Sequence, residues 1–199
     1  MKAYVVFCHP THESLMGAAL QRALAGLAAG SHAIRCTDLY ADGFDPAFSH
    51  ADHVNQHVDH RGHPERRPAI AAYVEHLQWC DTLVLVYPTW WSGQPAMMKG
   101  FIDRLFVNGV AWTLPDGADR IRPLLRNITK IVAVTSHGSS KFINSVEGEA
   151  GKRIVTRALR LICNVRCRTR WIAMYNVDRS TPSDRNAFLA RVERTMRRL

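Results

Sequence analysis

The chain has 199 residues, of which 47% are hydrophobic and 22% charged, and its formal net charge is +9 at pH 7. This composition excludes a disordered or fibrous protein, and the length suits one domain over residues 1–199 with a sizeable core. No apolar run approaches the roughly eighteen residues that a membrane span requires, and Met1-Lys2 leads into a predicted strand rather than a signal peptide. We therefore expect a cytoplasmic protein without stable membrane insertion.

The positive charge is concentrated in the second half of the chain. Residues 1–119 hold eight Lys and Arg against twelve Asp and Glu, whereas residues 120–199 hold eighteen against five. Such a surplus could face a nucleic acid, a membrane or an anionic substrate. The arginines fall at helical spacing or alternate with apolar residues, as Arg166, Arg168 and Arg170 do. We therefore interpret them as solvated faces and expect no nucleic-acid partner.

The five cysteines are scattered, mostly within apolar segments, and their number is odd. Buried free thiols in a reducing compartment explain this pattern better than a disulfide framework. Cys163 and Cys167 straddle a predicted junction between a helix and a strand. A redox pair is the alternative to buried packing there.

The chain opens with a strand and a helix. Residues 2–8 are continuous and apolar, as in a buried strand, and residues 9–13 form a loop. Ser14 is the predicted N-cap of a helix that ends near Gly30. A short β-compatible segment follows at residues 33–37. Residues 41–67 show no sustained period and predict a long connection with at most a short helix.

The middle of the chain predicts a second helix, a third strand and a third helix. The second helix spans residues 68–79, with Pro68 near its start. Residues 83–87 form a strand buried on both faces, which stops at Pro88 because proline removes a ladder donor. Pro95 is expected at the first position of a helix that ends near Phe106.

The last third predicts a turn-rich excursion at residues 109–117 and a fourth strand at 130–135. A helix at residues 148–162 and a fifth strand at 166–174 follow, and Thr181-Pro182-Ser183-Asp184 has the form of a capping box. Strands that alternate with helices predict a doubly wound α/β sheet with helices on both faces. Because no G-x-G-x-x-G follows the first strand, we predict five parallel strands in the flavodoxin-like order 2-1-3-4-5.

In such a sheet, ligands bind in loops at the carboxyl ends of the strands. After the first strand, His9, Ser14 and the backbone amides of Leu15 and Met16 could hold a phosphate. The alternative is that Ser14 is only a helix cap. After the third strand, two adjacent indoles and several backbone donors follow Pro88. A flavin needs both features, although the indoles could instead pack in the core or an interface.

After the fourth strand, Ser136, His137 and Gly138 form a small polar loop. His137 is the best candidate to touch a substrate or to donate a proton, although it could have no role.

Three segments resemble the NAD(P)H:quinone oxidoreductases, in particular the short bacterial branch: His9-Pro10 with Ser14, residues 87–105, and residues 135–138. The resemblance extends over about residues 1–140. It implies a flavin-bearing homodimer that passes hydride from NAD(P)H to a quinone or similar acceptor by a ping-pong mechanism, with FMN favoured over FAD. Our own candidates for catalytic roles are His137 and Trp91, which with Trp90 are expected to shape the acceptor pocket. The resemblance implies cofactor contacts at His9, Ser14, Leu15, Met16, Pro88, Thr89, Trp90, Trp91, Ser92, Ser136, His137 and Gly138.

The chain departs from the family pattern in three places. Met16 stands where the family usually has asparagine, and His137 where it usually has glycine. The tyrosine and histidine that long-chain members place beyond the fourth-strand loop are missing from residues 141–149. Charge on a reduced flavin would then be stabilised by backbone amides, His137 or Lys141.

Two other functions remain open at this point. The chain could be a flavodoxin-like electron carrier, or a flavin-binding regulatory subunit of a membrane transporter. Two features argue against an electron carrier: the net positive charge of the chain, and the absence of a first loop rich in Thr, Ser and Gly. A metal could bind the cluster of histidines at positions 50, 53, 57, 60 and 63, but no cysteine or carboxylate completes a ligand set, so no metal site is predicted.

Overall fold

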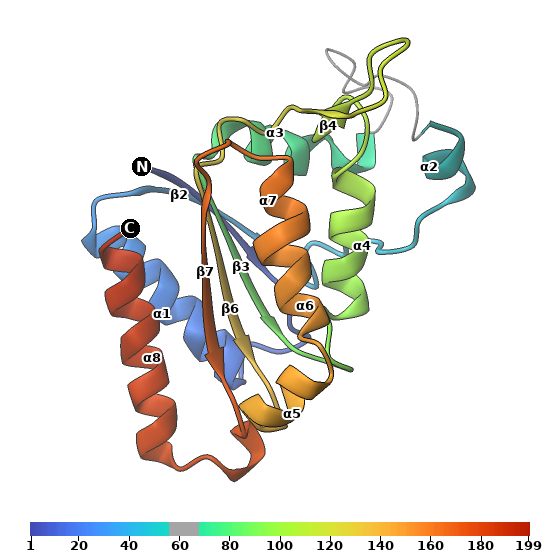
Figure 1. Cartoon of the computed structure of the whole chain (residues 1–199). Coiled ribbons are helices and arrows are strands. Elements are labelled where there is room, and N and C mark those ends of the chain that lie inside the picture. Colours follow the sequence, from blue (N-terminus) through green and yellow to red (C-terminus); the bar gives the residue numbers. More distant parts are fainter. Residues whose placement is uncertain (56–67) are drawn as a thin grey trace.

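A five-stranded parallel sheet forms the centre of the molecule in the computed structural model, which describes residues 1–55 and 68–199 (Figure 1). The strands lie in the order β2-β1-β3-β6-β7. This is the predicted order 2-1-3-4-5, because two short strands outside the sheet shift the numbering. The strands are β1 (Lys2–Phe7), β2 (Ala33–Asp38), β3 (Thr82–Pro88), β6 (Lys130–Ser136) and β7 (Arg168–Met174).

Helices cover both faces of this sheet, as Figure 1 shows. On one face, α1 (Leu15–Ala29) and α8 (Pro182–Arg197) pack over Val5, Phe7 and Val84. On the other face, α3 (Ala71–Trp79) and α4 (Ala96–Leu105) pack over Tyr4, Val6 and Leu85. Successive strand residues point to opposite faces, so β1 and β3 feed both cores and read as continuous apolar runs. The predicted doubly wound fold class is confirmed.

Capping residues that can be recognised in the sequence determine where several helices begin. The N-cap Ser14 accepts a hydrogen bond from the Gly17 amide at 3.0 Å, as predicted. Thr181 and Asp184 form the predicted capping box at the start of α8. The placement of Pro95 is wrong by one residue: it is the N-cap of α4, with ψ at 150°. A fixed φ and a missing N–H suit either position, so the pattern alone does not separate them.

Several short elements were not predicted or differ from the prediction. The predicted helix at 148–162 is present as one continuous helical run, made of α6 (Ala150–Arg153), a π-helical segment η3 (Ile154–Ala158) and α7 (Leu159–Leu161). The predicted helix at 68–79 begins with a 3-10 turn, η2 (Pro68–Ile70). The short helix α2 (His50–Asn55) agrees with the prediction for residues 41–67, which allowed at most a short helix. The additional elements are β4 (Trp112–Thr113), β5 (Arg122–Pro123), α5 (Lys141–Val146) and η4 (Val177–Arg179).

The cysteines are all free thiols, and Cys8, Cys80, Cys163 and Cys167 are buried. This agrees with buried packing at positions 163 and 167. Cys36 is exposed, so the expectation of burial is wrong there, because β2 is an edge strand of the sheet.

Two of the clustered histidines, His50 and His53, lie in α2, and the three at positions 57, 60 and 63 lie outside the described residues. Within residues 1–55 and 68–199, no group of three or more His, Cys, Asp or Glu side chains could hold a metal ion. None of the helices in these same ranges is long and apolar enough to cross a membrane.

Candidate functional site

The three predicted loops meet at the carboxyl edge of the sheet. The ring of His9, after β1, lies 6.4 Å from the ring of Trp90, after β3. The Thr89 amide donates to the carbonyl of Ser136 at 2.8 Å, which ties the loop after β3 to the end of β6. The topology therefore brings all three loops to one place, as the sequence predicted.

The first loop presents a helix N-terminus. The Ser14 hydroxyl donates to the carbonyl of Thr11 at 3.0 Å while it caps α1. The amides of Leu15 and Met16 belong to the first turn of α1, where an α-helix leaves its N–H groups without intrahelical acceptors. The Met16 side chain is buried in the core, so only its amide faces a ligand. The imidazole of His9 is held within the loop, with Nδ1 2.7 Å from the carbonyl oxygen of Thr11.

The first loop also depends on Gly17, which the sequence analysis did not single out. A Cβ atom at this position would lie 2.0 Å from the carbonyl oxygen of His12. The loop therefore packs directly on the first turn of α1. A glycine three residues after an N-cap serine is the signal that could have revealed this contact.

The loop after β3 is a strained two-residue turn. Trp90 and Gly93 exchange two backbone hydrogen bonds, at 3.2 and 3.1 Å. The two central residues, Trp91 and Ser92, have φ angles of 47° and 59°, in the left-handed region. This is the pattern of a type I′ turn, which favours Asn and Gly because each other residue costs about 1–2 kcal/mol there.

Despite that cost, the Trp91 indole has no packing role in the fold. Its side chain is fully exposed, and that of Trp90 is 44% exposed. The alternative that both indoles pack in the core is therefore contradicted. Backbone strain that presents an exposed aromatic ring is characteristic of a ligand-binding site.

Contacts from a distant part of the chain hold the strained turn in place. The Ser92 hydroxyl donates to the carboxylate of Glu147, just after α5. The Ser92 carbonyl accepts from the Gly151 amide at 3.1 Å, and the Gln94 side chain donates to the Gly151 carbonyl at 2.9 Å. Sequence reasoning assigned no site role to Glu147 or Gly151, since nothing local links them to a turn nearly sixty residues earlier.

The third predicted loop places His137 beneath the surface. Its side chain is buried and stacks on Tyr175, with ring centroids 4.6 Å apart. Its Nε2 lies 3.4 Å from the Thr89 hydroxyl, and its Nδ1 is buried without a hydrogen-bond partner. Burial lowers the pKa of His137 below its ordinary value, against the opposing fields of Glu149 and Glu147. Burial therefore favours the neutral imidazole.

A pocket of about 290 Å³ lies between these loops and α5. It is polar, with the Trp91 indole as its apolar wall. A Cβ at Gly138 would lie 2.8 Å from a carboxylate oxygen of Asp178, so the absence of a side chain keeps this loop flat. The pocket is lined by Thr89, Trp91, Ser92, His137, Gly138, Ser139, Asn144 and Glu147. It can hold the edge of a planar polar ring that stacks on the indole.

A family model described as "Flavodoxin-like fold" matches residues 1–199. The chain belongs to this flavodoxin-like family. It is 37% identical over 118 residues to the "Uncharacterized NAD(P)H oxidoreductase YcaK" of Escherichia coli (strain K12), an alignment that covers 56% of this chain and 55% of that protein. The chain spans about half the length of the curated relatives it matches: the alignments cover 55%, 49% and 56% of the lengths of three of them.

Solved structures share the fold at low sequence identity. The NAD(P)H:quinone oxidoreductase from Methanothermobacter marburgensis superposes with a TM-score of 0.79 and 22% identity, covering 99% of this chain and 94% of that one. An FMN-dependent NADH-azoreductase from Bacillus anthracis, in complex with FMN, gives a TM-score of 0.76 and 12% identity, covering 100% and 99%. The family resemblance stated from the sequence is confirmed.

Proposed function

We propose that the protein is a flavin-dependent oxidoreductase that uses NAD(P)H to reduce a quinone or a similar small oxidised acceptor by a ping-pong mechanism. The observation that carries the proposal is the strained turn that presents the exposed Trp91 ring beside a polar pocket. The relatives named NAD(P)H oxidoreductase and quinone oxidoreductase support this chemistry.

The residues at the carboxyl edge fit a flavin mononucleotide. A bound flavin would supply the hydride relay between NAD(P)H and the acceptor. Ser14 and the amides of Leu15 and Met16 would hold the phosphate, beside His9. Residues 88–92 would bind the ring, with Trp90 and Trp91 as stacking surfaces, and Ser136, His137 and Gly138 would approach its edge.

Backbone donors, with Lys141 at the start of α5 as the candidate cation, would stabilise negative charge at the ring. Burial favours the neutral form of His137, which donates one hydrogen bond and carries no charge. Glu147 contributes a carboxylate that Ser92 satisfies. Stabilisation would therefore come from amides in the loops after β3 and β6 and from Lys141, in an environment that excludes water on one side. His137 and Trp91 would act by shaping the acceptor pocket.

FMN is the proposed cofactor, supported by the FMN-bound structural neighbour. A second groove of about 570 Å³ lies beside Ser14, between the starts of α1 and α8. The mass of the released flavin would show whether this groove holds the longer tail of FAD. We also propose a cytoplasmic homodimer, in which the exposed Phe142 and Val146 of α5, near the ring pocket, would be covered.

The proposal is tested by the absorption spectrum of the purified protein and by anaerobic titration with NADH and NADPH. We expect a yellow protein, or one that takes up added FMN, that is bleached rapidly by a nicotinamide coenzyme. Replacing Trp90 and Trp91 together by Ala should release the flavin or abolish bleaching, whereas Phe48→Ala, an exposed aromatic outside the three loops and α5, should do neither. A colourless protein that binds neither FMN nor FAD would refute the proposal. Flavin that no coenzyme reduces would instead indicate an electron carrier.

A further inference from the structure

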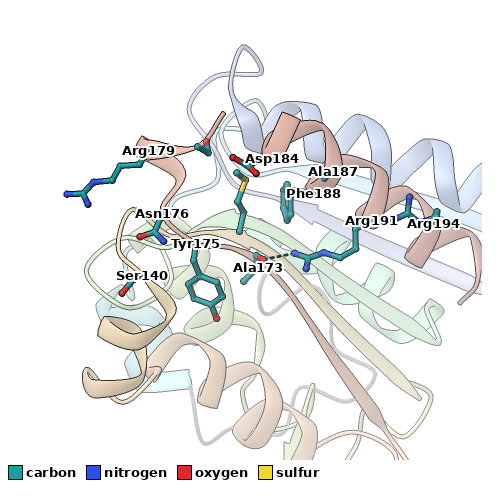
Figure 2. Close-up of a pocket in the computed structure, with 12 residues that line it drawn as sticks. Ser140, Ala173, Tyr175, Asn176, Arg179, Asp184, Ala187, Phe188, Arg191 and Arg194 are labelled. Carbon is teal, nitrogen blue, oxygen red and sulfur yellow. Dashed lines mark hydrogen bonds between the residues drawn. The ribbon is translucent and has the colours of Figure 1, made fainter. Parts of the chain in front are cut away.

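Another pocket, larger than the ring pocket and the groove beside Ser14, lies between the edge strand β7 and α8 (Figure 2). Its volume is about 850 Å³, within the usual range for small-molecule sites. Phe188 is buried at its base, and the carbonyl oxygen of Ala173 accepts a hydrogen bond from Arg191 at 2.6 Å. We call it the arginine pocket; its lining includes Arg179, Arg191, Arg194, Tyr175, Asn176 and Ser140.

The charge of this pocket selects an anion. Arg179, Arg191 and Arg194 form no ion pair with any carboxylate in the described part of the chain. The one lining carboxylate, Asp184, already accepts two hydrogen bonds from Thr181 in the capping box. Arg191 and Arg194 lie along α8, and Arg179 extends from the opposite end of the pocket (Figure 2). Guanidinium groups spread along a pocket in this way are suited to bind the separate phosphates of one ligand.

The arginine pocket adjoins the ring pocket. Tyr175 lines the arginine pocket and stacks on His137, which lines the ring pocket. Ser140 lines it as well and is the N-cap of α5, which carries Asn144. The two pockets thus share a wall, so one elongated ligand can contact both.

The length of the arginine pocket suits a dinucleotide. Asp184 and Arg194 both line it and lie ten residues apart on α8, or about 15 Å at the helical rise. A nicotinamide coenzyme has a reactive ring at one end and phosphate groups at the other. A nucleic acid duplex does not fit a pocket of this volume, whereas a single nucleotide does.

We infer that the arginine pocket binds the adenosine phosphates of NADPH. Arg194, at the end far from Tyr175, makes the protein prefer NADPH over NADH through the 2′-phosphate, and Arg179, at the opposite end, lies on the side of the 5′-phosphate. The inference rests on the proposed function, since it concerns the same coenzyme. Arg191 also has a structural role, because it donates a hydrogen bond to the carbonyl oxygen of Ala173 on the edge strand β7.

The test is a binding measurement that needs no turnover. Calorimetry on the purified protein, with its flavin if it carries one, would compare 2′,5′-ADP, which bears the 2′-phosphate of NADPH, with 5′-AMP. We expect 2′,5′-ADP to bind at least tenfold more tightly, and Arg194→Gln and Arg179→Gln each to lower its affinity about five- to tenfold, as loss of a charge-assisted hydrogen bond does. Arg166→Gln removes the same charge from an exposed site outside the pocket and is the matched control.

Steady-state kinetics provide the second readout, as the ratio of kcat/KM for NADPH to that for NADH. Arg194→Gln should lower this ratio, and Arg166→Gln should not. Equal affinity for the two nucleotides, or an equal loss in Arg166→Gln, would overturn the inference. NADH that bleaches the flavin without any 2′-phosphate preference would overturn the inference and leave the proposed function intact. Tight 2′,5′-ADP binding without bleaching by either coenzyme would support the pocket and refute the proposed function.

Discussion

Replacement of Trp91 by Gly should make the flavin-free protein more stable. The residue has a φ of 47°, which costs a tryptophan about 1–2 kcal/mol relative to glycine. Its indole is fully exposed, so its removal gives up no buried surface. Glycine makes the unfolded chain more flexible, which costs about 0.4–1 kcal/mol. The net stabilisation is about 0.5–1 kcal/mol.

Urea unfolding of the flavin-free protein measures this change directly. A gain of that size corresponds to a rise in Tm of about 1–4 °C at this chain length. Phe142→Gly is the control, because Phe142 is also exposed but lies in α5, where glycine should cost about 1 kcal/mol. The two substitutions of exposed aromatic residues should therefore change stability in opposite directions.

The same substitution should weaken flavin binding about tenfold or more, through loss of a stacking partner and its contact area. Fluorescence titration with FMN provides the measurement. If Trp91→Gly destabilises the flavin-free protein as much as Phe142→Gly does, the turn is not strained at this residue and the reasoning fails. If stability rises but FMN affinity is unchanged, Trp91 is not part of the cofactor site.

Three further substitutions test other parts of the structure. Gly17→Ala would bring a methyl group 2.0 Å from the His12 carbonyl, so it should cost about 1–3 kcal/mol in urea unfolding and lower FMN affinity; a neutral effect would exclude the close packing of the first loop. Arg104→Ala would remove the buried ion pair between Arg104 and the Asp52 carboxylate, at 3.0 Å, and should cost about 3–5 kcal/mol, much of which Asp52→Ala should restore in the double variant. Because burial lowers the pKa of His137, its contribution to stability is intact above the unfolded pKa of about 6.5 and is lost as the pH falls below that value. His137→Gln should therefore flatten the loss of stability between pH 7 and pH 5, and an unchanged pH profile would contradict burial of a neutral ring.

The main elements of the fold are predictable because parallel strands leave a strong signal. β3 is buried on both faces, so residues 83–87 read as an uninterrupted apolar run. The caps at Ser14 and Thr181 depend on residues within three positions of each other. The pairing of β4 with β5 was missed because two-residue strands carry no period, and α5 was missed because its Phe142 and Val146 are exposed and mark no buried face.

The place of the candidate site was predictable, but the direction of its side chains was not. Topology alone puts His9, Trp90 and His137 at the ends of adjacent strands. Periodicity ends where a strand ends, so it could not show that the His137 ring lies beneath the surface against Tyr175. It could not show either that the Met16 side chain turns into the core.

The strained turn persists because partners far along the chain fix it. Two left-handed residues cost about 2–4 kcal/mol together, and no single contact of the turn is of that size. Three hydrogen bonds join this turn to Glu147 and Gly151: Ser92 donates one and accepts one, and Gln94 donates the third. They contribute about 0.5–1.5 kcal/mol each, which together is of the same order. The shape of the turn is therefore determined by the segment after β6 as much as by residues 90–93. A short sequence window around residues 90–93 contains the strained residues but not the distant groups whose hydrogen bonds stabilise them. The indoles could therefore be assigned to a site from the sequence, while their geometry could not.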